Sequence, residues 1–226
     1  MARFTRIQTV LAMQETGLVP LFYHSDPEKC REVISACHAG GARLFEFTNR
    51  GDFAHEVFAE VKKWAAEHCP AMIIGAGSVA DAPTAAIFMQ MGADFIVAPT
   101  MNPDVARICN RRKVLWIPGC ATLTEISQAE ELGAEIVKIF PGHAAGGPSF
   151  VKAVKGPSPW TSIMPTGGVE PTEENLREWF DAGVTCVGMG SKLITDSHVK
   201  EAAWHEVTAK VKETLELIGK LRAAAH

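Results

Sequence analysis

The stretch Glu-Leu-Gly-Ala-Glu-Ile-Val-Lys-Ile-Phe at residues 131–140 contains the structural unit that this chain repeats. A helical segment ends at Gly133, because glycine reaches the left-handed backbone region of a helix end at little cost. The apolar run that follows, residues 135–140, has the composition of a strand covered on both faces. Helices that alternate with strands predict a parallel sheet joined by right-handed crossovers. The same order of helix, glycine and strand recurs around Gly41, Gly92 and Gly183.

Eight short apolar runs predict eight strands, and therefore a (β/α)8 TIM barrel of the α/β class. The N-terminal apolar run at 10–13 is too short for the apolar region of a signal peptide, which has roughly 7–15 residues. We therefore interpret the N-terminal segment as an extra amphipathic helix. The alternative architecture is a doubly wound open sheet, but the G-x-G-x-x-G motif typical of that fold does not follow the first strand. We expect one barrel domain over residues 1–226. The predicted strands are residues 18–22, 43–48, 72–76, 95–98, 114–118, 135–140, 162–165 and 186–189. The predicted helices include 27–39, 53–68, 82–91, 123–132, 172–181 and a long C-terminal helix from about 199 to 222.

The composition narrows the possible partners. The formal net charge is −4 and no basic patch is present, so we expect no nucleic-acid partner. No stretch approaches the roughly 18 apolar residues of a transmembrane helix, so we expect no membrane partner and a cytoplasmic location. The six cysteines are scattered without a C-x-x-C pair, which indicates free, buried thiols. The eight histidines form no H-x-x-x-H pair, and only His143 lies near the predicted site, so we expect no metal ion.

Two ionisable residues are predicted to point into the barrel. Side chains alternate along a strand, so Ile136, Lys138 and Phe140 share one face, and Glu46 lies on the corresponding face of the second strand. Burial disfavours the ammonium ion, and a neutral lysine amine is a nucleophile towards ketones. A carboxylate beside it can act as general acid and base. The alternatives are a lysine that extends to solvent, or a structural Glu46–Lys138 ion pair, although buried pairs are weak stabilisers.

Polar and glycine-rich segments follow several of the predicted strands, where barrel enzymes place their active sites. Arg50 has a planar fork that suits a carboxylate or a phosphate, although it could also be a solvated loop residue. The segment 75–79, Gly-Ala-Gly-Ser-Val, could bind a carboxylate or could be an ordinary turn with Ser78 near a helix start. Segments 165–169 and 188–191 follow strands seven and eight, where barrels often bind phosphate; simple turns are the alternative.

Taken in order, these motifs resemble the 2-keto-3-deoxy-6-phosphogluconate (KDPG) and 2-keto-4-hydroxyglutarate (KHG) aldolase family, from about residue 5 to residue 200. The resemblance implies a class I aldolase that cleaves a 2-keto-3-deoxy-6-phospho sugar acid to pyruvate and glyceraldehyde 3-phosphate, and 4-hydroxy-2-oxoglutarate to pyruvate and glyoxylate. It implies Lys138 as the Schiff-base lysine and Glu46 as the general acid and base. It also implies a homotrimer, a small-molecule substrate and no cofactor. The implied substrate-binding residues are Arg50, Thr48, Ser78, Pro99, Phe140, Thr166, Gly167, Gly168, Gly190 and Ser191.

The sequence departs from the family pattern at several positions. Ser78 stands where many members have threonine, and Asn49 replaces a leucine-like residue. The loop at 143–150 is longer than in compact members, and Gly-Met-Gly-Ser at 188–191 replaces a plainer Gly-Gly-Ser. The last two differences concern the aldehyde and phosphate end of the substrate, so the configuration at C4 and the need for phosphate stay open. A sugar-phosphate isomerase or epimerase, a non-catalytic sugar-acid binding protein and a metal-dependent aldolase are the rival readings.

Overall fold

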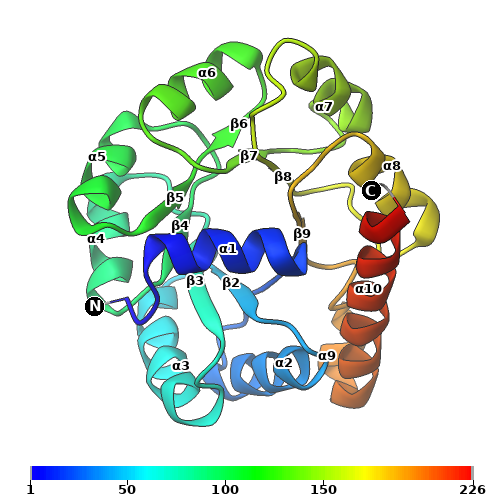
Figure 1. The fold of residues 1–226 in the computed structure, drawn as a ribbon. Helices are drawn as coiled ribbons and strands as arrows, with labels where there is room; N and C mark the ends of the chain where they lie inside the picture. The colour runs from blue at the N-terminus through cyan, green and yellow to red at the C-terminus, as the bar shows by residue number, and fades with distance from the viewer. Residues whose placement is uncertain (1, 225–226) are drawn as a thin grey trace.

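The computed structural model describes residues 2–224 as a barrel of parallel strands surrounded by helices (Figure 1). The predicted fold class is confirmed. The strands are β1 Leu18–Phe22, β2 Leu44–Thr48, β3 Ile73–Gly77, β4 Phe95–Val97, β5 Leu115–Ile117, β6 Gly119–Cys120, β7 Val137–Ile139, β8 Ile163–Pro165 and β9 Val187–Met189. The helices are α1 Arg6–Thr16, α2 Pro27–Ala39, α3 Ala54–His68, α4 Ala82–Gln90, α5 Pro103–Arg112, α6 Leu123–Glu131, α7 Gly147–Lys155, α8 Glu173–Asp181, α9 Asp196–Lys200 and α10 Trp204–Ala224.

The strands close into a ring through two ladders, β5-β4-β3-β2-β1-β9 and β6-β7-β8. β5 and β6 are two parts of one barrel strand, so the single strand expected at 114–118 is wrong in detail. Pro118 interrupts it because proline has no amide N–H to donate, but its carbonyl still accepts from the Lys138 amide at 2.8 Å. On the other side, a bridge between Thr166 and Gly188 joins the β8 and β9 edges. The described residues therefore occupy eight positions around the barrel, as predicted.

The glycine signal at the helix ends is confirmed. At the four helix ends where this pattern occurs, one glycine before the next strand has a positive φ, in the backbone region where a side chain would be strained. The values are 96° at Gly41, 93° at Gly92, 85° at Gly133 and 92° at Gly183.

Other helix predictions need correction. Pro103 predicts a helix start, and α5 does start at this residue, although its extent was not predicted. Helix α7 was not predicted, and its first turn takes up the end of the 143–150 segment that was expected to be loop. The long helix expected at about 199–222 is divided into α9 and α10, because the chain reverses at Ala202, whose φ is 51°. The helix expected to start at residue 53 starts at Ala54, since Phe53 takes a left-handed conformation.

The apolar core has two parts, one inside the barrel and one between strands and helices. Inside the barrel, Ala12 and Met13 of α1 pack with the inward side chains of the strands, so α1 closes the lower end of the barrel. Figure 1 shows this helix lying across the opening. The polar residues of the barrel interior are thereby confined to the other end. The inward strand residues are Val19, Leu44, Ile73, Phe95, Val97, Leu115, Ile117, Ile136, Met164 and Cys186.

The six cysteines are free and buried, as predicted. Burial raises the pKa of the Cys109 and Cys186 thiols to about 12, so these thiols behave as small apolar side chains of the core. None of the helices within residues 2–224 is both long enough and apolar enough to cross a bilayer.

A buried carboxylate attaches the N-terminal arm to the barrel. Asp94 accepts hydrogen bonds from the amides of Arg3 at 2.7 Å and Ile74 at 3.0 Å, and it pairs with the ammonium group of Lys62. Both side chains are buried, and burial lowers the pKa of Lys62 while the Asp94 charge opposes that shift. The carboxylate satisfies backbone donors from two segments far apart in the chain, so it stabilises the lower end of the barrel.

We predict that Asp94→Asn lowers the free energy of unfolding by about 3–5 kcal/mol at pH 7, because it leaves the Lys62 ammonium group buried without its counter-charge. Urea denaturation measures the change. Asp104→Asn is the matched control: it breaks the exposed pair with Arg107 and should cost less than about 1 kcal/mol. An equal loss of unfolding free energy in the two variants would contradict the stabilising role of the Asp94–Lys62 pair.

Candidate active site

Lys138 lies in the middle of β7 and points into the barrel. Its neighbours Val137 and Ile139 belong to the core under the helices, whereas Ile136 belongs to the core inside the barrel. The alternation predicted from the sequence is therefore confirmed. Lys138 is only 5% exposed, and it is flanked across the sheet by Gly119 and Met164.

Glu46 points into the same space from β2 and is 1% exposed. A side chain at Gly77 would occupy the same place, since a Cβ built there would lie 1.9 Å from Glu46 Oε1. Gly77 was expected in a turn, but it belongs to strand β3, directly beside Thr48 of β2. Its missing side chain leaves the room that the Glu46 carboxylate needs.

The two charged groups lie close together without a hydrogen bond between them. Lys138 Nζ is 3.9 Å from Glu46 Oε1 and 4.8 Å from the centre of the Phe140 ring. This N–O distance exceeds that of a protein hydrogen bond, and Glu46 Oε2 has no partner among the described residues. Leaving a buried carboxylate oxygen unsatisfied costs free energy, so this arrangement is a poor structural ion pair. It is suited to a ligand that occupies the space beside both groups.

A cavity of about 320 Å³ lies at the ends of β1, β2, β7, β8 and β9. Glu46 and Lys138 do not line it, but Thr48 and Phe140, each two residues further along the same chain segments, do. The cavity is lined by residues from several segments of the chain, because all the parallel strands of a barrel end at the same face. Thr166 Oγ1, on its wall, is buried and has no partner within residues 2–224. The predicted residues that line the cavity are Thr48, Arg50, Phe140, Thr166, Gly167, Gly190 and Ser191.

Besides Glu46 and Lys138, three predicted residues do not line the cavity. Ser78 has a φ of 58° and accepts a weak hydrogen bond from Arg50 Nε at 3.5 Å, and it lies three residues before Asp81, the N-cap of α4. Pro99 contributes to packing, since its carbonyl oxygen would lie 2.1 Å from a Cβ at Gly119. Gly168 lies against His143, whose Cβ would be 2.4 Å from a Cβ at that position.

Sequence analysis missed several residues of the cavity wall. Leu21, Phe22 and Tyr23 line it from the end of β1, and Ile194 and Asp196 line it after β9. The rule that barrel sites form at strand ends would have found them if it had been applied to the first strand and to the segment after Ser191.

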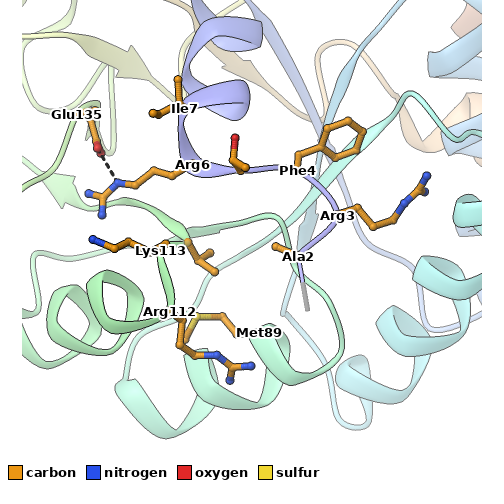
Figure 2. Close-up of a pocket in the computed structure, with 11 residues that line it drawn as sticks. Ala2, Arg3, Phe4, Arg6, Ile7, Met89, Arg112, Lys113 and Glu135 are labelled. Atoms are coloured by element: carbon orange, nitrogen blue, oxygen red, sulfur yellow. Dashed lines mark ion pairs between the residues drawn. The ribbon is translucent and has the colours of Figure 1, made fainter.

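A second, larger cavity of about 700 Å³ lies at the N-terminal arm, between the start of α1 and the ends of α4 and α5. Figure 2 shows Arg6 pointing across it to Glu135, with which it forms an ion pair of 2.6 Å. None of the predicted site residues lines this cavity. Among the described residues, no group of three or more His, Cys, Asp and Glu side chains is placed to hold a metal ion.

Comparison with known proteins agrees with the geometry. The family model described as KDPG and KHG aldolase matches residues 10–210. A 2-dehydro-3-deoxy-phosphogluconate aldolase of Pseudoalteromonas atlantica is 33% identical over 88% of this chain and 89% of that protein. A 2-dehydro-3-deoxy-6-phosphogalactonate aldolase of Escherichia coli is 37% identical over 65% of this chain and 70% of that protein. The crystal structure of a Legionella pneumophila KDPG aldolase, with pyruvate captured as a carbinolamine, has the same fold: its TM-score is 0.83 at 24% identity, covering 92% of this chain and 98% of that one.

We predict that the double variant Glu46→Gln/Lys138→Met leaves the free energy of unfolding unchanged or raises it by up to about 4 kcal/mol. The reason is that the attraction between the two charges is weaker than the free-energy cost of removing them from water. Chemical denaturation measures the difference.

The matched control is Asp94→Asn/Lys62→Met, which removes the other buried pair. It should lower the free energy of unfolding by about 1–3 kcal/mol, because an amide cannot accept all the hydrogen bonds that Asp94 accepts. A loss of more than about 1 kcal/mol in the Glu46/Lys138 double variant would mean that this pair is structural.

Proposed function

The chain belongs to the KDPG and KHG aldolase family, and on this premise we propose that it is a class I aldolase that cleaves 2-keto-3-deoxy-6-phosphogluconate to pyruvate and glyceraldehyde 3-phosphate. Family membership makes it an aldolase, a carbon–carbon lyase. One observation supports the class I mechanism above all others. A nearly buried lysine amine and a buried carboxylate oxygen lie 3.9 Å apart, on strands β7 and β2, whose ends reach the cavity wall.

The first step uses Lys138 as nucleophile. The neutral amine of Lys138 adds to the C2 ketone of the substrate. The carbinolamine formed loses water to give an iminium ion, which is the electron acceptor for the next step. Glu46 supplies and removes the protons that addition and dehydration require, since its free Oε2 shares the space beside Lys138 Nζ.

The second step breaks the C3–C4 bond. Glu46 removes the proton of the C4 hydroxyl, directly or through a water molecule, and the C4–O bond becomes the carbonyl of the departing aldehyde. The electron pair of the C3–C4 bond moves to the iminium and gives an enamine. Protonation at C3 and hydrolysis then release pyruvate and restore the Lys138 amine. No step needs a metal ion or an organic cofactor.

The remaining predicted residues are proposed to bind the two ends of the substrate. Arg50, supported by Ser78 and Thr48, takes the 1-carboxylate, because a guanidinium donates two parallel hydrogen bonds to a carboxylate. Phe140 and Pro99 bound the middle of the pocket. The phosphate end is proposed to be formed by Thr166, Gly167, Gly168, Gly190 and Ser191, at the two strand ends where barrels often bind phosphate.

The substrate range follows from the family. The matching model includes KHG aldolases, so we propose that 4-hydroxy-2-oxoglutarate, cleaved to pyruvate and glyoxylate, is a second substrate. Relatives act on the gluconate and on the galactonate phosphate, so both configurations at C4 are candidates. We further propose, from the family resemblance, a homotrimer that works in the cytoplasm. The comparisons favour none of the isomerase, epimerase or non-catalytic readings.

We predict that sodium borohydride in the presence of pyruvate attaches a reduced pyruvyl group to Lys138, because the reagent reduces the iminium to a stable amine. Intact mass and peptide mapping identify the modified residue. Lys138→Met should give no adduct while remaining folded by circular dichroism. If the parent protein gives no adduct under conditions that label a known class I aldolase, the proposed mechanism is wrong.

We predict that Gly77→Ala lowers kcat for aldol cleavage by about 100-fold or more, because the new methyl group displaces the Glu46 carboxylate and general acid–base catalysis is lost. Coupled detection of pyruvate measures the rate. Gly75→Ala is the matched control on the same strand: its methyl group meets the Phe95 ring at 2.4 Å, so it should lower the melting temperature and retain kcat per folded molecule. Full activity in Gly77→Ala would contradict the role of Glu46.

A further inference from the structure

The wall of the cavity at the strand ends carries two charged side chains of opposite sign. Arg50 lines it from the end of β2, and Asp196 lines it from the first residue of α9. Asp196 follows Gly190 and Ser191 in the chain segment after β9, and no lysine or arginine of that segment lines the cavity. This segment, part of the end proposed to receive a phosphate group, therefore contributes a carboxylate to the wall and no lysine or arginine.

Asp196 lies in the first turn of the short helix α9, where a carboxylate favours the helix dipole, but its side chain is not the N-cap. Helix α9 is capped by Thr195, whose hydroxyl accepts from the His198 amide at 3.3 Å. Within the described residues, the Asp196 carboxylate has no hydrogen bond and no ion pair, and its side chain is exposed. Lys192, four residues before Asp196, pairs with Glu170 at 2.8 Å, and His198, two residues after it, lies 3.7 Å from Glu206. The Asp196 charge is thus free to act on whatever occupies the cavity.

Such a carboxylate affects phosphate esters and free hydroxyl groups in opposite ways. A phosphate dianion beside it is repelled, and the repulsion is strengthened where the protein displaces water. A hydroxyl group can instead donate a hydrogen bond to it, and hydrogen bonds to charged acceptors are the stronger ones.

We propose that Asp196 is a specificity-determining residue: it lowers the preference of this enzyme for a phosphate ester at the far end of the substrate and accepts hydrogen bonds from free hydroxyl groups there. This inference rests on the proposed function. The residue touches the substrate end that becomes the aldehyde product, so its effect falls on the aldehyde and leaves the pyruvate half unchanged.

The test compares two aldehydes in the synthetic direction, with pyruvate as the common partner: D-glyceraldehyde 3-phosphate and D-glyceraldehyde. We expect Asp196→Asn to raise the ratio of kcat/KM for the phosphorylated aldehyde over the free aldehyde by about tenfold, mainly through KM. The gain should shrink in about 1 M salt, where charges interact over only about 3 Å. Asp181→Asn, the same change on an exposed carboxylate at the far end of α8, should leave the ratio unchanged.

An unchanged or lower ratio in Asp196→Asn overturns the proposal, as does an equal rise in Asp181→Asn, which would reflect net charge alone. Borohydride trapping of pyruvate on Lys138 is measured in the parent protein and in both variants. It distinguishes a failure of the role of Asp196 from a failure of the proposed aldolase function. Equal adducts with an unmoved ratio refute only the role of Asp196, whereas no adduct in the parent protein refutes the proposed function itself.

Discussion

The space inside the barrel is the constraint on which the rest of this structure depends. Eight parallel strand positions enclose a volume that side chains must fill, and α1 adds Ala12 and Met13 to fill it from below. At the upper end the inward positions include glycines, and each leaves room for a particular neighbour. Gly75 makes room for the Phe95 ring and Gly77 for the Glu46 carboxylate. The Glu46 carboxylate can therefore be buried beside Lys138 without displacing strand β3.

Two buried ion pairs in this molecule show how differently the same chemistry can be used. Asp94 accepts hydrogen bonds from Lys62 and from backbone amides of two segments, so its charge is well satisfied and holds the N-terminal arm in place. Glu46 and Lys138 are as deeply buried, yet they are 3.9 Å apart and one carboxylate oxygen has no partner in the described chain. The first pair supports the fold, and the second is the one that we propose acts on a substrate. On this proposal, stability and function depend on different ion pairs.

Much of this could be predicted from the sequence, because it depends on local periodicity. Alternation along a strand placed Lys138 and Glu46 on the inward face, and the glycines at 41, 92, 133 and 183 marked the helix ends correctly. Other features could not be predicted. Gly77 was expected in a turn, although it is a residue of β3 that makes room for a neighbour across the barrel. Helix α7 was not predicted, and Asp196 carried no local signal of its place in the cavity wall.

The sequence by itself determined the order of strands and helices and the inward face of each strand, because these follow from patterns within a few residues. It also determined the family to which the chain belongs, because the motifs occur in the order that the family has. Only the tertiary structure decided which glycine gives space to which side chain, how far Lys138 lies from Glu46, and that Tyr23 and Asp196 share one cavity with Arg50. These features arise when the barrel closes and brings β1 beside β9, two strands from opposite ends of the chain. Distances across a closed ring depend on the packing of every strand in it, and no local pattern records them.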